Sequence, residues 1–190
     1  KYGVVSDMVQ SVDDEGEKCV TVTIMSGTKN YTYDLTEEEA KAVLERGTSG
    51  VLALSGDDDY PYAVPMSYVY DGTRLIFHSA LTGHKIDAIH QNSKASFCVV
   101  EKDSVIPDEY TTYFISVIAF GKIRILDRNE AREAAKVLGA KYRPGFAEEL
   151  ADTVERNLDK MIVFALEIEH LTGKQAKELV RAEKAENTAL

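Results

Sequence analysis

The chain has 190 residues, of which 44% are hydrophobic and 28% are charged, so it is long and apolar enough to bury a substantial core. Its formal net charge of -10 argues against nonspecific binding to nucleic acids or anionic membranes, because both need a basic surface. No stretch of the sequence approaches the roughly 18 consecutive apolar residues of a membrane-spanning helix, so we expect neither a nucleic-acid partner nor a membrane partner.

The first segment of the chain has the pattern of short β-strands. Apolar and polar residues alternate in "YGVVSDMVQSV" and "KCVTVTIMS", and the stretches "DDEGE" and "GTKN" punctuate them as turns. The composition changes near Leu35. We therefore predict a small β meander or appendage over residues 1–34 and a main domain over residues 35–190.

The main domain is predicted to begin with a helix, because Thr36 and Glu39 have the spacing of a capping box and Gly47 supplies a stop. Further helices are predicted over residues 83–91, 128–142, 146–158 and 172–186, and Asp127 with Glu130 forms a second predicted capping box at the start of the helix over residues 128–142. The predicted strands between them are "GVLALS", "YAVPMSYVY", "RLIFHS", "KASFCVVE", "YTTYFISVIAFGKIRIL" and "MIVFALEIE". Antiparallel strands joined by short turns, with helices inserted, indicate an α+β fold built on a β-barrel.

One strand-to-helix turn, "FHSALTGHKIDAI" at residues 77–89, concentrates polar chemistry. A helix N-terminus offers unpaired N–H groups to an anion, Gly83 lets the backbone approach a ligand, and Lys85 adds a positive charge. Ser79 and Thr82 add hydroxyl groups. The pattern fits a phosphate-binding turn, but it fits equally a structural turn in which Thr82 caps the helix and Lys85 is solvated.

Metal sites and disulfides have little support in the sequence. None of the four histidines has a cysteine or paired carboxylate at metal-ligand spacing. Cys19 and Cys98 fall in predicted strands and are interpreted as small buried side chains. A cytoplasmic location is the default expectation. Because the chain starts at Lys1 rather than Met, the question whether a signal peptide was removed stays open.

A series of blocks resembles a known family. These blocks occur in order and are "GVLALSGDDDYPYAVPMSYVYDGTRLIFHSALTGHKIDAI", "ASFCVVE", "YTTYFISVIAFGKIRIL" and "EIEHLTGKQAKEL". They are similar to the FMN-binding split barrels of the pyridoxamine 5'-phosphate oxidase-like group, and most similar to its 5-nitroimidazole resistance subgroup. The resemblance covers roughly residues 36–180. It implies a mainly antiparallel six-stranded split β-barrel with flanking helices that binds FMN at a homodimer interface.

The resemblance also implies the cofactor-binding residues. Gly83 and His84 stand where the related oxidases have Ser and Arg, while Lys85 keeps the family lysine. Ser116 stands where those oxidases have a glutamine that reaches the cofactor. With the hydroxyls of the turn, the candidate cofactor-binding residues are Val64, Pro65, Met66, Ser67, His78, Ser79, Thr82, Gly83, His84, Lys85 and Ser116.

The resemblance implies an FMN-dependent oxidoreductase. The chain has no Trp and so lacks part of the pattern that the oxidases use for their pyridoxal phosphate substrate. The subgroup is associated instead with reduction of nitroaromatic drugs, which implies a small-molecule substrate. The electron donor would be a nicotinamide cofactor or another donor. His78 is the candidate catalytic residue, as a proton donor, although a purely cofactor-packing role fits equally well. A non-catalytic flavin- or haem-binding protein of the same fold is the alternative function.

Overall fold

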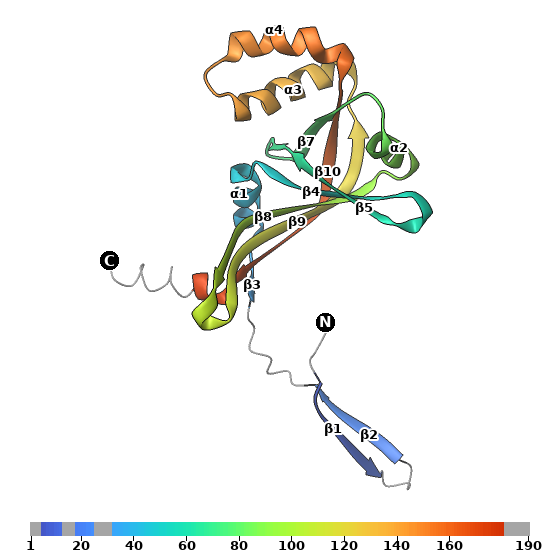
Figure 1. Ribbon diagram of the computed structural model, residues 1–190, viewed down its shortest axis with the longest axis vertical. Coiled ribbons are helices and arrows are strands. Elements are labelled where there is room, and N and C mark those ends of the chain that lie inside the picture. Colours follow the sequence, from blue (N-terminus) through green and yellow to red (C-terminus); the bar gives the residue numbers. More distant parts are fainter. Residues whose placement is uncertain (1–4, 13–17, 25–31, 181–190) are drawn as a thin grey trace, which may run out of the picture. The chain divides into compact units, whose positions relative to one another are not determined.

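The computed structural model describes residues 5–12, 18–24 and 32–180, and the chain divides into two compact units after Tyr31 (Figure 1). In the first unit, β1 (Val5–Val12) and β2 (Lys18–Ile24) pair antiparallel. The second unit contains β3 (Thr32–Asp34), α1 (Glu37–Arg46), β4 (Ser49–Ser55), η1 (Asp57–Asp59), β5 (Pro61–Ser67), β6 (Val69–Tyr70), β7 (Arg74–Ser79), α2 (His84–Gln91), β8 (Lys94–Ile106), η2 (Pro107–Glu109), β9 (Thr111–Ile125), α3 (Arg128–Tyr142), α4 (Ala147–Asn157), η3 (Leu158–Lys160) and β10 (Ile162–Ala176).

The strands of the second unit form one antiparallel sheet. Its order is β5-β4-β8-β9-β10-β7-β6, and β3 pairs with β10. Because β5 and β6 are one predicted strand interrupted at Tyr68, the path contains the six strands that the sequence predicts. The predicted α+β split barrel with flanking helices is therefore confirmed. Residues 32–34, which the strand pattern assigned to the N-terminal meander, belong to this larger sheet.

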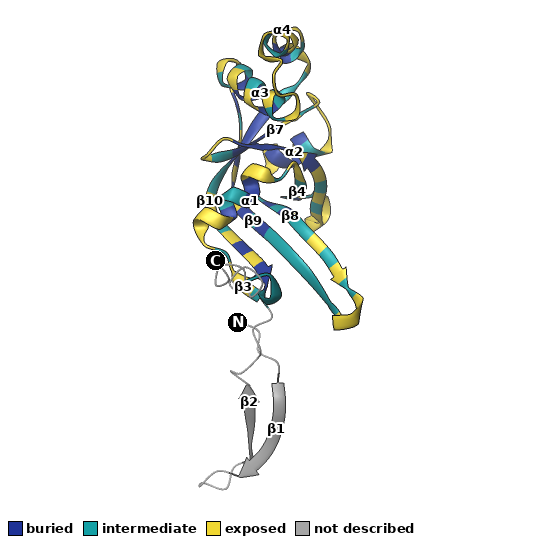
Figure 2. Ribbon diagram, turned by 90° about the vertical axis from the view of Figure 1, so that its left-hand side faces the viewer, coloured by how far each residue is buried: buried dark blue, intermediate teal, exposed yellow. Residues whose placement is uncertain are grey.

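The barrel interior is filled by a cluster of aromatic rings. Phe77 lies 5.0 Å from Phe97 and 5.2 Å from Phe164, centroid to centroid, and Tyr68 lies 4.9 Å from Phe97. All four side chains are fully buried. Each projects from a different part of the sheet, as the period-two alternation of strands requires. Figure 2 shows the buried residues gathered around β7, β10 and α2, whereas the tip of the β8–β9 hairpin is exposed.

A second core lies between the outer face of the barrel and α3. Ile76 of β7 and Val163 and Ala165 of β10 pack with alanines and leucines of α3 and α4. The N-terminus of α3 has the predicted capping box, with Asp127 accepting from the backbone of Glu130 and the Glu130 side chain returning to Asp127. Figure 1 shows α3 beside the barrel, with α4 stacked on it as an outer layer.

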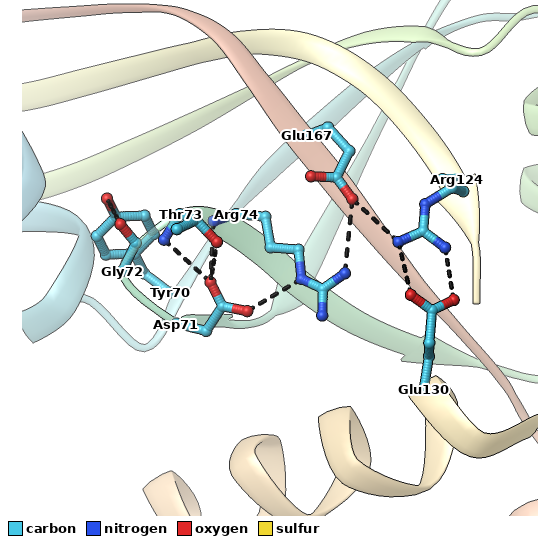
Figure 3. A network of polar contacts seen from close by, with 8 residues as sticks. All are labelled: Tyr70, Asp71, Gly72, Thr73, Arg74, Arg124, Glu130 and Glu167. Atoms are coloured by element: carbon cyan, nitrogen blue, oxygen red, sulfur yellow. Dashed lines mark hydrogen bonds and ion pairs between the residues drawn. The ribbon is translucent and has the colours of Figure 1, made fainter. Parts of the chain in front are cut away.

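A polar network fixes the N-terminal end of α3 to the barrel (Figure 3). Arg74 bridges Asp71 of its own turn and Glu167 of β10. Arg124 at the end of β9 then joins Glu167 to Glu130 of α3. Four elements are thus held together by alternating charges, and the position of the α3–α4 helical hairpin is set by these contacts as well as by apolar packing.

Two predicted boundaries are wrong. The strand predicted to end at Glu101 continues to Ile106, because β8 stays paired with β9 beyond an irregularity between Val100 and Lys102. The helix predicted to begin at Thr172 is preceded by strand as far as Ala176. Within the described part of the chain, no helix is long and apolar enough to cross a membrane.

Candidate functional site

The turn between β7 and α2 has the backbone that its sequence predicts. Gly83 is the N-cap of α2, with φ of +126°, a conformation that side chains rarely adopt. Its carbonyl accepts from the N–H groups of Ile86 and Asp87 at 2.8 and 3.1 Å, and no side chain caps the helix. The alternative in which Thr82 is the cap is therefore wrong. Thr82 is exposed beside Gly83, and a Cβ added to Gly83 would meet nothing within 4 Å, so the turn is open to a ligand.

Lys85 in the first turn of α2 is a half-buried cation. Burial lowers the pKa of its ammonium group, because the charged form loses hydration. Among residues 32–180, no carboxylate forms an ion pair with Lys85, and no acceptor forms a hydrogen bond with its side chain. A desolvated cation without a counter-charge is stabilised by an anion that approaches the same turn.

The neighbouring histidine has partners that the sequence analysis did not foresee. The exposed ring of His84 packs edge-on against Tyr62 of β5 at 4.4 Å, and its Nδ1 lies 3.5 Å from Oδ2 of Asp57. Asp57 is the first acidic residue of "GDDDY", a stretch whose sequence predicts a solvated turn. The fold instead places one of its carboxylates beside the candidate phosphate turn, where it competes with an anion for His84.

The β5 residues of the candidate site divide between the two faces of the sheet. Val64 packs against the main core and Met66 is buried in it, whereas Pro65 and Ser67 are exposed on the other face. Because β5 ends the strand order, its outer edge has no neighbour among the described strands. The buried side chain of Met66 therefore cannot reach a ligand at this edge, whereas the side chain of Val64 is only partly buried.

The structure brings Ser67 and His78 together. Both line a cavity of ≈ 370 Å³ between the sheet and the α3–α4 hairpin. His78 is exposed on β7, opposite Val163 of β10, and among the described residues no hydrogen-bond partner contacts its side chain or that of Ser67. Ser79 follows as the last residue of β7, half-buried and opposite Ile162.

Ser116 does not line this cavity. It lies on β9 between Val100 of β8 and Lys174 of β10. Strand alternation places it on the outer face of the sheet, together with the exposed side chains of Val100 and Phe120. If Ser116 contacts a ligand at the cavity, it must do so from another copy of the chain.

The helical hairpin supplies residues that the sequence analysis missed. Tyr142 of α3 and Asn157 of α4 line the cavity beside His78. They lie more than 60 residues after His78 in the chain, and no local motif links them to it. The pairing of β10 with β7 and β9 brings the hairpin over this face.

Three comparisons place the chain among known proteins. The family model described as pyridoxamine 5'-phosphate oxidase matches residues 36–175. An uncharacterised protein of Rhizobium meliloti (strain 1021) is 28% identical over 150 residues, which cover 75% of this chain and 93% of that protein.

Two solved structures share the fold. A candidate 5-nitroimidazole antibiotic resistance protein from Bacteroides thetaiotaomicron VPI-5482 is 18% identical with a TM-score of 0.64, over 75% of this chain and 87% of that one. The FAD and haem binding protein from Mycobacterium smegmatis is 20% identical with a TM-score of 0.67, over 77% and 73%. At these identities the two structures establish a common fold.

Proposed function

Because the chain belongs to the pyridoxamine 5'-phosphate oxidase family, as its sequence blocks predicted, we propose that it binds a flavin and reduces a small oxidised substrate such as a nitroaromatic compound. FMN is the proposed flavin, and a nicotinamide cofactor is the proposed electron donor. The candidate nitroimidazole resistance protein that shares the fold supports this substrate class. Oxidation of pyridoxamine phosphate is not proposed, since the chain contains no Trp.

The observation that carries the proposal is the half-buried Lys85, which has no partner among residues 32–180 and lies at the start of α2, where no side chain caps the helix. A phosphate at this turn would receive the N–H groups of the first helical turn and the Lys85 ammonium group. Gly83 leaves room for the oxygen atoms, and the hydroxyls of Ser79 and Thr82 lie in the same turn. FMN ends in such a phosphate, and FAD presents a diphosphate at the corresponding place.

The flavin ring has a proposed position along the exposed edge of β5. Backbone N–H and C=O groups of this strand can pair with the polar edge of the ring, in the manner in which a further strand would pair. Pro65 has no N–H and can offer the ring only its carbonyl. When bound, the flavin supplies the hydride or electron chemistry.

A homodimer with FMN at its interface is part of the proposal. Val51 of β4, Val100 of β8 and Phe120 of β9 are exposed apolar side chains on the outer face of the sheet. A second copy packed on this face would remove them from water, which stabilises association. Ser116 lies on the same face, so dimerisation would bring it towards the partner's cofactor. The molar mass in solution, measured by light scattering, tests this part.

His78 is the proposed proton donor to the reduced substrate. Its exposed side chain has no partner among the described residues, and it borders a cavity large enough for a small molecule. A positioned histidine contributes about 10²- to 10⁴-fold to a proton transfer. Replacement by alanine should slow turnover by at least about tenfold with flavin still bound. Exposed His90 on α2 is the matched control, and its replacement by alanine should change neither property.

The alternative function is a flavin or haem carrier without turnover. The same imidazole, which has no partner among the described residues and borders an uncharged cavity, could serve as an axial ligand of haem iron. The FAD and haem binding protein from Mycobacterium smegmatis, which shares the fold, supports this alternative.

The absorption spectrum of the purified protein tests both functions. Flavin bands that survive desalting after addition of FMN, followed by consumption of NADH or NADPH with a nitroaromatic acceptor, would support the reductase. Chromatography of the flavin released by heating would distinguish FMN from FAD. A Soret band, lost in the His78→Ala variant, would support the haem carrier. A colourless protein that binds neither cofactor would refute both.

A further inference from the structure

The cavity beside His78 is a half-open pocket between the sheet and the α3–α4 hairpin. Its roof consists of α3 and α4, and its floor is the outer face of the sheet at Ser67 and His78. The residues of α3 that face it include Ala135 and Gly139, which are too small to fill the space. Gly139 also sets the height of the roof, because a Cβ there would lie 2.3 Å from a methyl carbon of Leu150 in α4. The close approach of the two helices therefore depends on this glycine.

Some polar side chains of the cavity already form hydrogen bonds, and others do not. The Tyr142 hydroxyl is occupied, since it accepts from the Tyr68 N–H at 2.9 Å and reaches the carbonyls of Tyr68 and Thr48. The Asn157 amide nitrogen donates to a backbone carbonyl of α4 at 2.8 Å, and its oxygen accepts no hydrogen bond from the described residues. The side chains of Ser67 and His78 lack hydrogen-bond partners within the described part of the chain.

The charge of the lining restricts the ligand further. Among the described residues that form the cavity, none is Asp, Glu, Lys or Arg, and half have no polar side-chain group, namely Ala135, Leu138, Gly139, Val154 and Met161. Moving an ion into such a space without a counter-charge is costly, whereas an apolar body gains from burial. The volume of ≈ 370 Å³ lies at the lower end of the range for small-molecule sites. It corresponds to about a dozen water molecules in the liquid, or a single substituted ring.

We infer that this cavity binds a compact uncharged molecule with an apolar, ring-sized body, and that a hydrogen-bond acceptor on this molecule is held by Ser67 and His78. The identification of this molecule as the substrate of the enzyme rests on the proposed function, but its binding does not. The cavity thus selects against anionic compounds, although the turn at Lys85 on the other side of Ser79 favours anions. One face of the protein would hold the charged tail of the cofactor, and the cavity would hold a neutral reactant.

Three probes of similar size separate the parts of this inference. Nitrobenzene is neutral with acceptor oxygens, benzoate has nearly the same shape with a negative charge, and toluene has the ring without an acceptor. Binding to the full chain, stripped of any flavin, is measured by ligand-observed NMR saturation transfer. We expect nitrobenzene to bind at least tenfold more tightly than benzoate and severalfold more tightly than toluene. Benzoate binding as tightly as nitrobenzene would overturn the inference.

Variants place the probes in the cavity. Ala135→Leu fills the space from the roof and should weaken nitrobenzene and toluene at least tenfold, whereas Ala140→Leu, on the exposed face of the same helix, should not. Ser67→Leu fills the space from the floor and provides a second variant should Ala135→Leu fail to fold. His78→Ala should abolish the preference for nitrobenzene over toluene. Unchanged probe binding in the folded filling variants would refute the location.

The cofactor measurement keeps this test separate from the proposed function. Probe binding without any flavin binding would leave the cavity site standing while the reductase proposal fails. Flavin binding with no probe binding would refute the cavity site and leave the reductase proposal standing. Displacement of nitrobenzene by FMN would show that the cavity holds the flavin ring, which would overturn the inference of a separate site.

Discussion

Lys85 provides the sharpest test of the phosphate-binding turn, through the variant Lys85→Met. Methionine keeps most of the side-chain volume and removes the charge. Because no described carboxylate pairs with Lys85, its whole charge is available to a phosphate, and a hydrogen bond to a charged group contributes about 1.5–3 kcal/mol. The Kd for FMN should therefore rise about 10- to 150-fold. Riboflavin lacks the phosphate, so its Kd should be unchanged.

The assay is quenching of flavin fluorescence during titration of the flavin-free protein with FMN and, separately, with riboflavin. Lys41→Met is the matched control, because Lys41 on α1 already has a partner in Glu37. Its removal should leave the ratio of the two flavin affinities as in the unaltered protein. A Lys85→Met protein with an unchanged ratio would show that the phosphate binds elsewhere, and the assignment of the turn would be abandoned.

The pH dependence of the stability of the flavin-free protein is an independent test of the burial of Lys85. Burial lowers the pKa of Lys85 below its ordinary 10.5, so between its folded pKa and 10.5 the unfolded chain binds more protons than the folded one. The free energy of unfolding should therefore rise with pH through this interval. Lys85→Met should lack that rise and be at least as stable as the unaltered protein at neutral pH. A variant that is much less stable at pH 7 would mean that Lys85 has a structural role.

Three further predictions concern other parts of the fold. Asp57→Asn should strengthen FMN binding by up to about fivefold, because an exposed ion pair contributes at most about 1 kcal/mol and His84 would be released to the phosphate. Fluorescence titration checks this, and weaker FMN binding by the variant would contradict it. Gly121→Ala should lower the free energy of unfolding by about 3 kcal/mol in chemical denaturation, because its Cβ would lie 1.9 Å from a backbone oxygen of β10; a variant as stable as the parent would count against so close an approach of β9 and β10. Burial alone would raise the pKa of Asp71, but hydrogen bonds from Arg74 and Thr73 lower it below 3.8. The stability that this carboxylate contributes is therefore present above pH 3.8 and is lost as the pH falls through the folded pKa. The stability difference between the parent and Asp71→Asn should shrink below pH 3.8, and a constant difference would contradict the reasoning.

The parts of the fold that the sequence predicts correctly are those determined by neighbouring residues. Both capping boxes, Thr36 with Glu39 and Asp127 with Glu130, form as expected because each joins residues three apart. The strand ends are predicted less well. The extension of β8 to Ile106 depends on pairing with β9, and such pairing leaves little trace in the local pattern.

The candidate site shows the same division. Gly83 and Lys85 lie in one short turn, and the need for a positive φ and an open helix start is readable from that turn alone. The carboxylate of Asp57 beside His84 was not predictable, because it depends on how the η1 turn folds back towards α2. The roof over His78 was equally hidden, since it comes from a hairpin that follows three further strands or helices.

Contacts at both ends of α3 hold this helix in place over the cavity. At its C-terminal end, the Tyr142 hydroxyl holds the backbone of Tyr68, and the Lys141 ammonium group contacts the Gly47 carbonyl and lies 4.6 Å from the centre of the Tyr68 ring. At its N-terminal end, Glu130 is held by Arg124. A helix fixed at both ends keeps its position even where an inward side chain is small, as Ala135 is over His78. Tyr142 both anchors the roof and lines the cavity, whereas Ala135 lines the cavity and makes none of these anchoring contacts. Substitutions at Ala135 can therefore change ligand selection while the barrel and its turn at Lys85 stay intact.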